Sequence, residues 1–185
     1  MKTLETGRLI LRDWRTDEAE AMFEYAKNPN VGPNAGWPAH QSIEESQKIV
    51  QQFAKGDEVW AVVGRESGVP IGSLGVHPDR KRDIPGSRMI GYVLGEEWWG
   101  KGLMTEAVAR ALQFLFEETD VSIVSVYHYP FNARSRRVIE KAGFVYEGTL
   151  RMASRLPDGR VVDDMCYSIT REEYFARRGV TALTR

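Results

Sequence analysis

The chain has 185 residues, 42% hydrophobic and 28% charged, which is the composition of a globular protein and excludes a disordered chain. Its 25 Lys and Arg residues balance 26 Asp and Glu residues, so the net charge of −1 favours neither nucleic acid nor anionic lipid as a partner. One cysteine, Cys166, excludes an internal disulfide, and the three histidines lack the spacing of a zinc pair, so no metal is expected.

The first eight residues carry charges where a secretory signal would have its apolar core, and no stretch approaches the roughly 20 apolar residues of a membrane span. We therefore expect a cytoplasmic protein with no membrane partner. Without repeats or linkers, residues 1–185 are predicted to form one domain, with a core over about 8–170 and a short C-terminal tail at 171–185.

The first half of the chain predicts a strand, two helices and three further strands. Ser42 and Glu45 form a capping box that begins the second helix. The segment between the helices is rich in Asn, Pro and Gly and predicts a loop, whose unusual length is typical of functional segments. In chain order we predict a strand at 8–14, a helix at 16–27, the loop at 28–38, a helix at 42–55, and strands at 59–63, 71–76 and 88–94.

The second half alternates helices and strands. Apolar residues recur at helical spacing over 101–117, and Gly143 is placed to end a short helix at 132–142. Strands are predicted at 121–128, 144–155 and 161–170, the last two flanking a Pro-Asp-Gly turn. This order indicates an α+β or α/β fold and differs from a simple Rossmann alternation.

A glycine-rich turn joins the strand at 88–94 to the helix at 101–117. Gly100 and Gly102 let backbone N–H groups crowd at a helix N-terminus, a cradle suited to phosphate or pyrophosphate. A P-loop would need Ser or Thr in place of Gly102, and a dinucleotide fingerprint would need glycine in place of Thr105. Phosphate binding and a simple tight turn remain the two interpretations of the segment alone.

Further motifs around this turn make the chain resemble the GCN5-related N-acetyltransferase (GNAT) family. The family's acetyl-CoA motif, [Q/R]-x-x-G-x-[G/A], falls on residues 97–102, although Glu97 departs from it at the first position. The resemblance covers about 8–170 and is closer to the RimJ/RimL-type branch of ribosomal-protein N-terminal acetyltransferases. The matching blocks are Ile90-Gly91-Tyr92, Trp99-Gly100-Lys101-Gly102, Thr105-Glu106-Ala107, Asn132-Ala133-Arg134-Ser135 and Lys141-Ala142-Gly143-Phe144-Val145-Tyr146-Glu147-Gly148.

This resemblance implies a single domain with a central, mixed, splayed sheet of about seven strands flanked by about four helices. It implies direct acetyl transfer from acetyl-CoA to a primary amine, without a metal. The groups implied to hold acetyl-CoA are Tyr92, Val93 and Leu94 on the strand, Trp99, Gly100, Lys101, Gly102, Leu103 and Met104 at the turn, and Asn132 and Ser135 on the next helix.

Asn132 and Ser135 each have a structural and a functional interpretation. Asn132 is placed to cap its helix, with the N–H of Ser135 as the donor, and its family counterpart also contacts the cofactor. Many family members protonate the leaving thiolate with a tyrosine that would stand at Ile139 here, so Ser135 is the candidate general acid. Nearby Arg134, Arg136 and Arg137 are either contacts for the 3′-phosphate or a solvated basic face.

No general base is evident in the sequence. The residues considered, none favoured over the others, are His40, Glu58, His77, His128 and Asp164. At pH 7 deprotonation costs roughly 4.6 kcal/mol for a Lys-like amine of pKa about 10.4, but only about 1.4 kcal/mol for an α-amine near pKa 8. An α-amine can therefore lose its proton to a water chain, which favours a peptide or protein N-terminus as acceptor.

Two alternatives stay open: an acetyltransferase for a small-molecule amine (a polyamine, an amino acid or an aminoglycoside), and a non-catalytic acyl-CoA-binding module. Trp37 in the long loop is either an aromatic wall for the acceptor or a packing residue. The expected partners are acetyl-CoA, an amine acceptor such as a ribosomal or other protein N-terminus, and a second copy of the chain in a homodimer.

Overall fold

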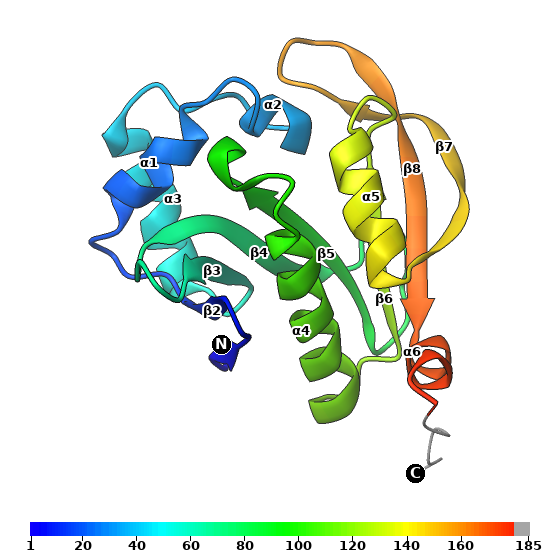
Figure 1. The fold of residues 1–185 in the computed structure, drawn as a ribbon. Coiled ribbons are helices and arrows are strands. Elements are labelled where there is room, and N and C mark those ends of the chain that lie inside the picture. The colour runs from blue at the N-terminus through cyan, green and yellow to red at the C-terminus, as the bar shows by residue number, and fades with distance from the viewer. Residues whose placement is uncertain (180–185) are drawn as a thin grey trace.

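The computed structural model describes residues 1–179, which build one mixed sheet of eight strands in the order β1-β2-β3-β4-β5-β6-β8-β7 (Figure 1). The strands are β1 (Leu4–Glu5), β2 (Leu9–Asp13), β3 (Val59–Gly64), β4 (Pro70–Pro78), β5 (Ser87–Leu94), β6 (Ile123–His128), β7 (Val145–Arg155) and β8 (Val161–Thr170). The helices are α1 (Ala19–Ala26), α2 (Gly32–Ala35), α3 (Ile43–Lys55), the 3-10 helix η1 (Glu96–Trp98), α4 (Leu103–Glu118), α5 (Ala133–Ala142) and α6 (Arg171–Arg177).

Helices cover both faces of the sheet, and β3 shows how the sequence specifies this. Trp60 and Val62 pack in the cluster that contains the apolar side of α4, whereas Val59, Ala61 and Val63 pack against α1 and α3. Because successive side chains of a strand point to opposite faces, a strand buried on both sides is apolar throughout. The expected mixed α/β architecture is confirmed.

The splay in the sheet lies between β5 and β6. β5 pairs with β4 along its whole length, from Leu94 opposite Gly72 to Arg88 opposite Pro78. It pairs with β6, in parallel, at only three positions, the last of which joins Met89 to Ser125. Beyond Met89 the two strands have no ladder between them, so the C-terminal half of β5 presents an edge inside the sheet.

Asp79 stabilises the closed end of this splay, where the pairing of β5 with β6 ends at Met89 and Ser125. Its carboxylate accepts hydrogen bonds from the Ser125 hydroxyl (2.8 Å), the Lys81 N–H (2.8 Å) and the Arg82 guanidinium (3.0 Å). Burial alone would raise the pKa of this carboxyl, but these hydrogen bonds lower it below its ordinary value. The link from the β4–β5 connection to Ser125 ties the two halves of the sheet together where their pairing ends.

The structure adds elements that the sequence did not predict. Within the expected loop at 28–38 lies the single turn of α2, and residues 4–5 add β1 to the sheet. Residues 171–177, expected in the C-terminal tail, form α6, and residues 180–185 of that tail lie outside the described part of the chain. With these additions the described residues contain eight strands and six α-helices, against about seven and four expected.

The sequence features of α6 explain why it forms. Thr170 and Glu173 make a reciprocal capping box. The Arg171 guanidinium donates to the carbonyls of Val121 (3.0 Å), Phe116 and Thr119, which closes the C-terminal end of α4. Within residues 1–179, no helix is both long and apolar enough to cross a lipid bilayer.

Candidate active site

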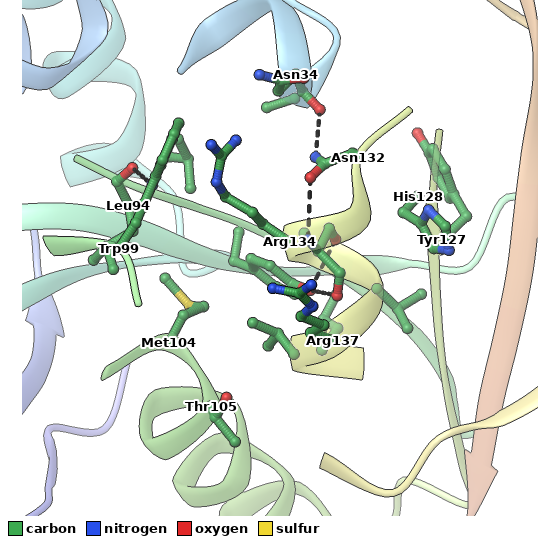
Figure 2. A pocket seen from close by; sticks show the side chains of 18 of the residues that line it. Asn34, Leu94, Trp99, Met104, Thr105, Tyr127, His128, Asn132, Arg134 and Arg137 are labelled. Atoms are coloured by element: carbon green, nitrogen blue, oxygen red, sulfur yellow. Dashed lines mark hydrogen bonds between the residues drawn. The ribbon is translucent and has the colours of Figure 1, made fainter. Parts of the chain in front are cut away.

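A cavity of about 730 Å³ opens where β5 and β6 diverge, and its volume lies in the range of ligand pockets. One end is formed by the glycine turn, the start of α4 and the first turns of α5 (Figure 2). The opposite end is formed by the last residues of β4 and by β6, from which Tyr127 and His128 line the cavity, and α2 lies beside the first turn of α5. We call these the turn end and the β6 end.

Backbone conformation prepares the turn end for an anion. Gly100 and Gly102 both have φ of +75°, a left-handed conformation that favours glycine. A Cβ at Gly100 would meet no atom within 4 Å, so the glycine is needed for its backbone angle and leaves open space. Gly102 is the N-cap of α4, and no side chain of the described residues caps this helix. Its first residues, Leu103, Met104 and Thr105, line the cavity.

Side chains on both sides hold the turn in place. The Trp99 indole donates to the Leu94 carbonyl at 2.7 Å (Figure 2). The Arg8 guanidinium donates to the Lys101 carbonyl at 2.9 Å and to the Glu106 carboxylate at 2.7 Å. Arg8, directly before β2, thereby couples the first turn of α4 to the start of that strand.

Ten of the eleven residues predicted to hold the cofactor line the cavity. They are Tyr92, Val93, Leu94, Trp99, Gly100, Gly102, Leu103, Met104, Asn132 and Ser135, and the predicted acceptor residue Trp37 lines it as well. Lys101 does not line the cavity, because its carbonyl is turned to Arg8 and its ammonium lies over the Trp98 ring, 4.8 Å from the centroid. The Lys101 side chain therefore lies outside the cavity, and the prediction that concerns Lys101 is that its backbone binds the cofactor.

Basic side chains from α5 line the same cavity. Arg134 lies over the Trp99 ring at 4.3 Å, and Arg137 and Lys141 line the wall one and two turns further along the helix. Arg136, by contrast, pairs with Glu140 at 2.7 Å and does not line the cavity. Within residues 1–179 no Asp or Glu side chain lines the cavity, so its ionised groups are positive, as an anionic ligand requires.

Asn132 acts as the expected cap and has a further contact. Its side-chain oxygen accepts from the N–H of Ser135 at 3.0 Å, and its side-chain amide donates to the Asn34 carbonyl at 2.9 Å (Figure 2). The second bond ties α2 to the N-terminal end of α5. The capping interpretation is therefore confirmed, and a contact from Asn132 to the cofactor stays a prediction.

The Ser135 hydroxyl lies beside a phenol that the sequence did not single out. The Tyr92 hydroxyl lies 2.9 Å from the Ser135 Oγ and 3.1 Å from the Ser135 carbonyl. Burial raises the pKa of Tyr92 well above its ordinary value, so the phenol stays neutral and can donate. The sequence predicts only a backbone role for Tyr92, because spacing along the chain does not reveal a contact between a strand and a helix 43 residues later.

Two histidines line the β6 end. His128 is buried, with Nδ1 2.8 Å from the Tyr129 carbonyl and Nε2 3.4 Å from the Tyr167 hydroxyl. His77, on β4, lies with Nδ1 2.8 Å from the Glu58 carboxylate. Trp37, half-buried, packs over Gly32, where a Cβ would lie 2.5 Å from its ring, so it both packs and lines the cavity.

The remaining base candidates lie outside the cavity. His40 is engaged by the Ser46 hydroxyl at 2.7 Å, and burial lowers its pKa. Asp164 is buried and pairs with Lys81 at 2.8 Å while accepting from the Ser154 hydroxyl at 2.7 Å. The structure thus brings only His77 and His128 of the five candidates to the cavity, with Glu58 behind His77.

Comparison with known proteins gives consistent results. A family model described as an acetyltransferase (GNAT) domain matches residues 8–145. The uncharacterized N-acetyltransferase YoaA of Bacillus subtilis is 30% identical over 173 residues, covering 91% of this chain and 96% of that protein. The [ribosomal protein uS5]-alanine N-acetyltransferase of Escherichia coli is 29% identical over 85 residues, 46% of this chain and 43% of that protein. The crystal structure of a GNAT-family acetyltransferase from Bacillus anthracis superposes with a TM-score of 0.84 at 22% identity, covering 92% of this chain and 99% of that one, which shows the shared fold.

Proposed function

The chain belongs to the GNAT family of N-acetyltransferases, and from this premise we propose that it transfers the acetyl group of acetyl-CoA to the α-amine of a peptide or protein N-terminus. The observation that carries the proposal is the single cavity whose turn end suits phosphates and whose β6 end holds titratable side chains. Acetyl-CoA supplies an activated thioester, and the residues of the chain bind and orient it and move protons.

The turn end fits the charged part of the cofactor. N–H groups at the start of α4, with Gly100 and Gly102, are the donors for the diphosphate. Arg134, Arg137 and Lys141 are the cations for its remaining negative charge. Backbone groups of β5 beyond Met89, which β6 leaves without ladder partners, are the groups for the pantetheine amides.

The inside edge of β5 leads from the turn end towards the β6 end. Ser135 lines this path, with its hydroxyl fixed by Tyr92. We assign it the proton for the sulfur that leaves when the acetyl group is transferred.

Charge supports an acceptor with a single amine. With Arg134, Arg137 and Lys141 assigned to the cofactor, Arg80 is the remaining cation among the described lining residues, and no carboxylate lines the cavity. The further positive charges of a polyamine or aminoglycoside would therefore find no acid to pair with. An α-amine also costs roughly 3 kcal/mol less to deprotonate at pH 7 than a Lys-like amine. The uS5-alanine acetyltransferase relative, similar over less than half of its length, supports the RimJ/RimL-type assignment and a ribosomal protein N-terminus as one acceptor to test.

Thiol release by the purified protein with acetyl-CoA tests the proposal. We expect turnover with a peptide that has a free N-terminus and lacks lysine, and at least about tenfold less with an N-blocked, lysine-containing peptide or with spermidine at pH 7. A preference for the blocked peptide or for spermidine would reverse the acceptor assignment. Binding of CoA without thiol release from any amine would instead support the non-catalytic module.

A further inference from the structure

His77, at the β6 end of the cavity, is a histidine whose two ring nitrogens have different surroundings. We infer that it is the general base for the acceptor amine and that Glu58 orients it; the inference rests on the proposed function. Because the Glu58 carboxylate can only accept a hydrogen bond, the neutral ring carries its proton on Nδ1, 2.8 Å from that carboxylate. Nε2, which lies against Gly75, has no hydrogen-bond partner among the described residues and is the nitrogen left to take a proton from an incoming ammonium.

Two facing glycines provide the space for this ring. Gly75 lies two residues before His77 on the same face of β4, and a Cβ there would be 2.4 Å from Nε2. Gly75 pairs with Gly91 on β5, where a Cβ would meet no atom within 4 Å. The His77 ring therefore covers bare backbone on β4, and the bare backbone beside it on β5 belongs to the cavity wall.

The strand register places His77 and Ser135 on opposite faces of the sheet. On β4, Ser73 shares a face with Gly75 and His77, and its hydroxyl lies 2.9 Å from that of Tyr25 on α1. On β5, Tyr92 points to the other face, where it reaches Ser135 on α5. A base on the α1 side and a proton donor on the α5 side suit a reaction in which the amine enters from one face and the sulfur leaves towards the other.

The other groups at this end are less suited to the role. His128 is buried at 5% exposure and has a partner at each nitrogen, the Tyr129 carbonyl and the Tyr167 hydroxyl. Arg80, the charged residue that also lines this end, is always protonated. Glu58 does not line the cavity, so it acts through His77 as a positioning residue.

The reaction balances with these groups. An ammonium proton of the acceptor passes to Nε2 of His77, and the Glu58 carboxylate stabilises the imidazolium that forms. The amine nitrogen then bonds to the thioester carbonyl carbon as the carbon–sulfur bond breaks. The sulfur takes the Ser135 proton, Ser135 recovers one from solvent, a second proton leaves the amide nitrogen to solvent, and His77 releases its own. Relative to an ammonium acceptor, the sum is an amide, free CoA thiol and one proton.

The test compares His77→Gln with wild type in thiol release, using whichever amine the wild type acetylates fastest. We expect kcat/KM to fall about 100-fold at pH 7. The loss should shrink as the pH rises past the pKa of the acceptor, about 8 for an α-amine, because free amine then needs no base. The dissociation constant for CoA, measured by calorimetry, should stay within about twofold, because His77 lies at the end of the cavity away from the phosphates.

Variants of two glutamates supply the matched control. Glu58→Gln keeps an acceptor for Nδ1 but removes the charge, so we expect about a tenfold fall in kcat with KM unchanged. Glu66→Gln, at an exposed position in the turn between β3 and β4, should behave as wild type. Rescue by Glu58→Asp would show that the carboxylate, and not packing, carries the effect.

Three results would overturn the inference. The first is a loss of kcat/KM below twofold in His77→Gln at pH 7, and the second is a loss of kcat/KM that does not change with pH. The third is the same pH-dependent loss in His128→Gln while His77→Gln is unaffected. An acceptor other than a peptide would overturn the proposed function while the His77 comparison still decides the base. Failure of every amine with the wild type would overturn both.

Discussion

Removing the Tyr92 hydroxyl tests whether the phenol orients Ser135. Both of its hydrogen bonds go to that residue, 2.9 Å to Oγ and 3.1 Å to the carbonyl. One hydroxyl proton serves one acceptor at a time, so Tyr92→Phe removes about 1 kcal/mol of net hydrogen bonding. For a chain of this length, that loss lowers Tm by about 2–4 °C.

The effect on catalysis follows from the freedom that Ser135 gains. Without Tyr92 its hydroxyl can occupy any of about three staggered positions, so we expect kcat to fall about threefold to tenfold. The KM for acetyl-CoA should not change, because the backbone of Tyr92 is retained. Ser135→Ala, which removes the proton donor itself, should lower kcat by about 100-fold.

A double-mutant cycle in thiol release decides between coupling and coincidence. If Tyr92 acts through Ser135, then Tyr92→Phe has no further effect on kcat in the Ser135→Ala background. Equal fold-changes in both backgrounds would refute the reasoning. Tyr146→Phe is the control, because the Tyr146 hydroxyl bonds to Thr149 at 2.6 Å and the residue does not line the cavity.

Three further predictions concern the turn end of the cavity and the closed end of the splay. Gly102→Ala, at φ +75°, should cost about 1 kcal/mol of stability and weaken CoA binding, whereas Gly68→Ala, at φ +69° in a distant turn, should cost as much stability and leave CoA binding unchanged by calorimetry. Arg134→Gln should weaken CoA binding about fivefold, and Arg136→Gln, on the same helix but outside the cavity, should not; equal effects would contradict the assignment. The pKa of Asp79 is lower in the folded than in the unfolded chain. The ionised carboxylate therefore stabilises the fold above about pH 3.9, and this stabilisation is lost as the pH falls through the folded-state pKa. Asp79→Asn should therefore reduce the free energy of unfolding by about 3 kcal/mol at pH 7, with a smaller gap to wild type at pH 3 in urea titrations.

Local signals predicted most of the fold. The capping box at Ser42 forms as expected in part, since Ser42 accepts from the N–H of Glu45, and Asn132 caps α5 as predicted. β1 has two residues and α2 four, lengths at which periodicity carries no information. Thr170 and Glu173 are a capping-box signal for α6, but this signal directly follows a predicted strand, and the tail is expected without a helix.

The candidate site also has a part that the sequence predicts and a part that depends on the fold. The glycine turn is contiguous in sequence, so its residue types alone predict a tight turn, and the matching blocks around it are needed to favour phosphate binding there. The Tyr92–Ser135 and His77–Glu58 pairs depend on how strands and helices are placed, and the second pair needs the register of β3 against β4 to bring together residues 19 positions apart. Lys101 shows the converse limit, because a residue inside a motif can still point its side chain away from the cavity that the motif lines.

Because the pairing between β5 and β6 is interrupted, the cofactor can be recognised without depending on which side chains β5 carries. Cofactor amides that lie along the free edge of β5 would substitute for a missing strand, so CoA would be read by main-chain groups that every residue type possesses. The side chains of that segment are then released for other tasks: Tyr92 reaches Ser135, Val93 packs towards α1 and α3, and Leu94 joins the core on the α4 side. On the proposed function, one short strand would serve the ligand through its backbone and serve chemistry and packing through its side chains.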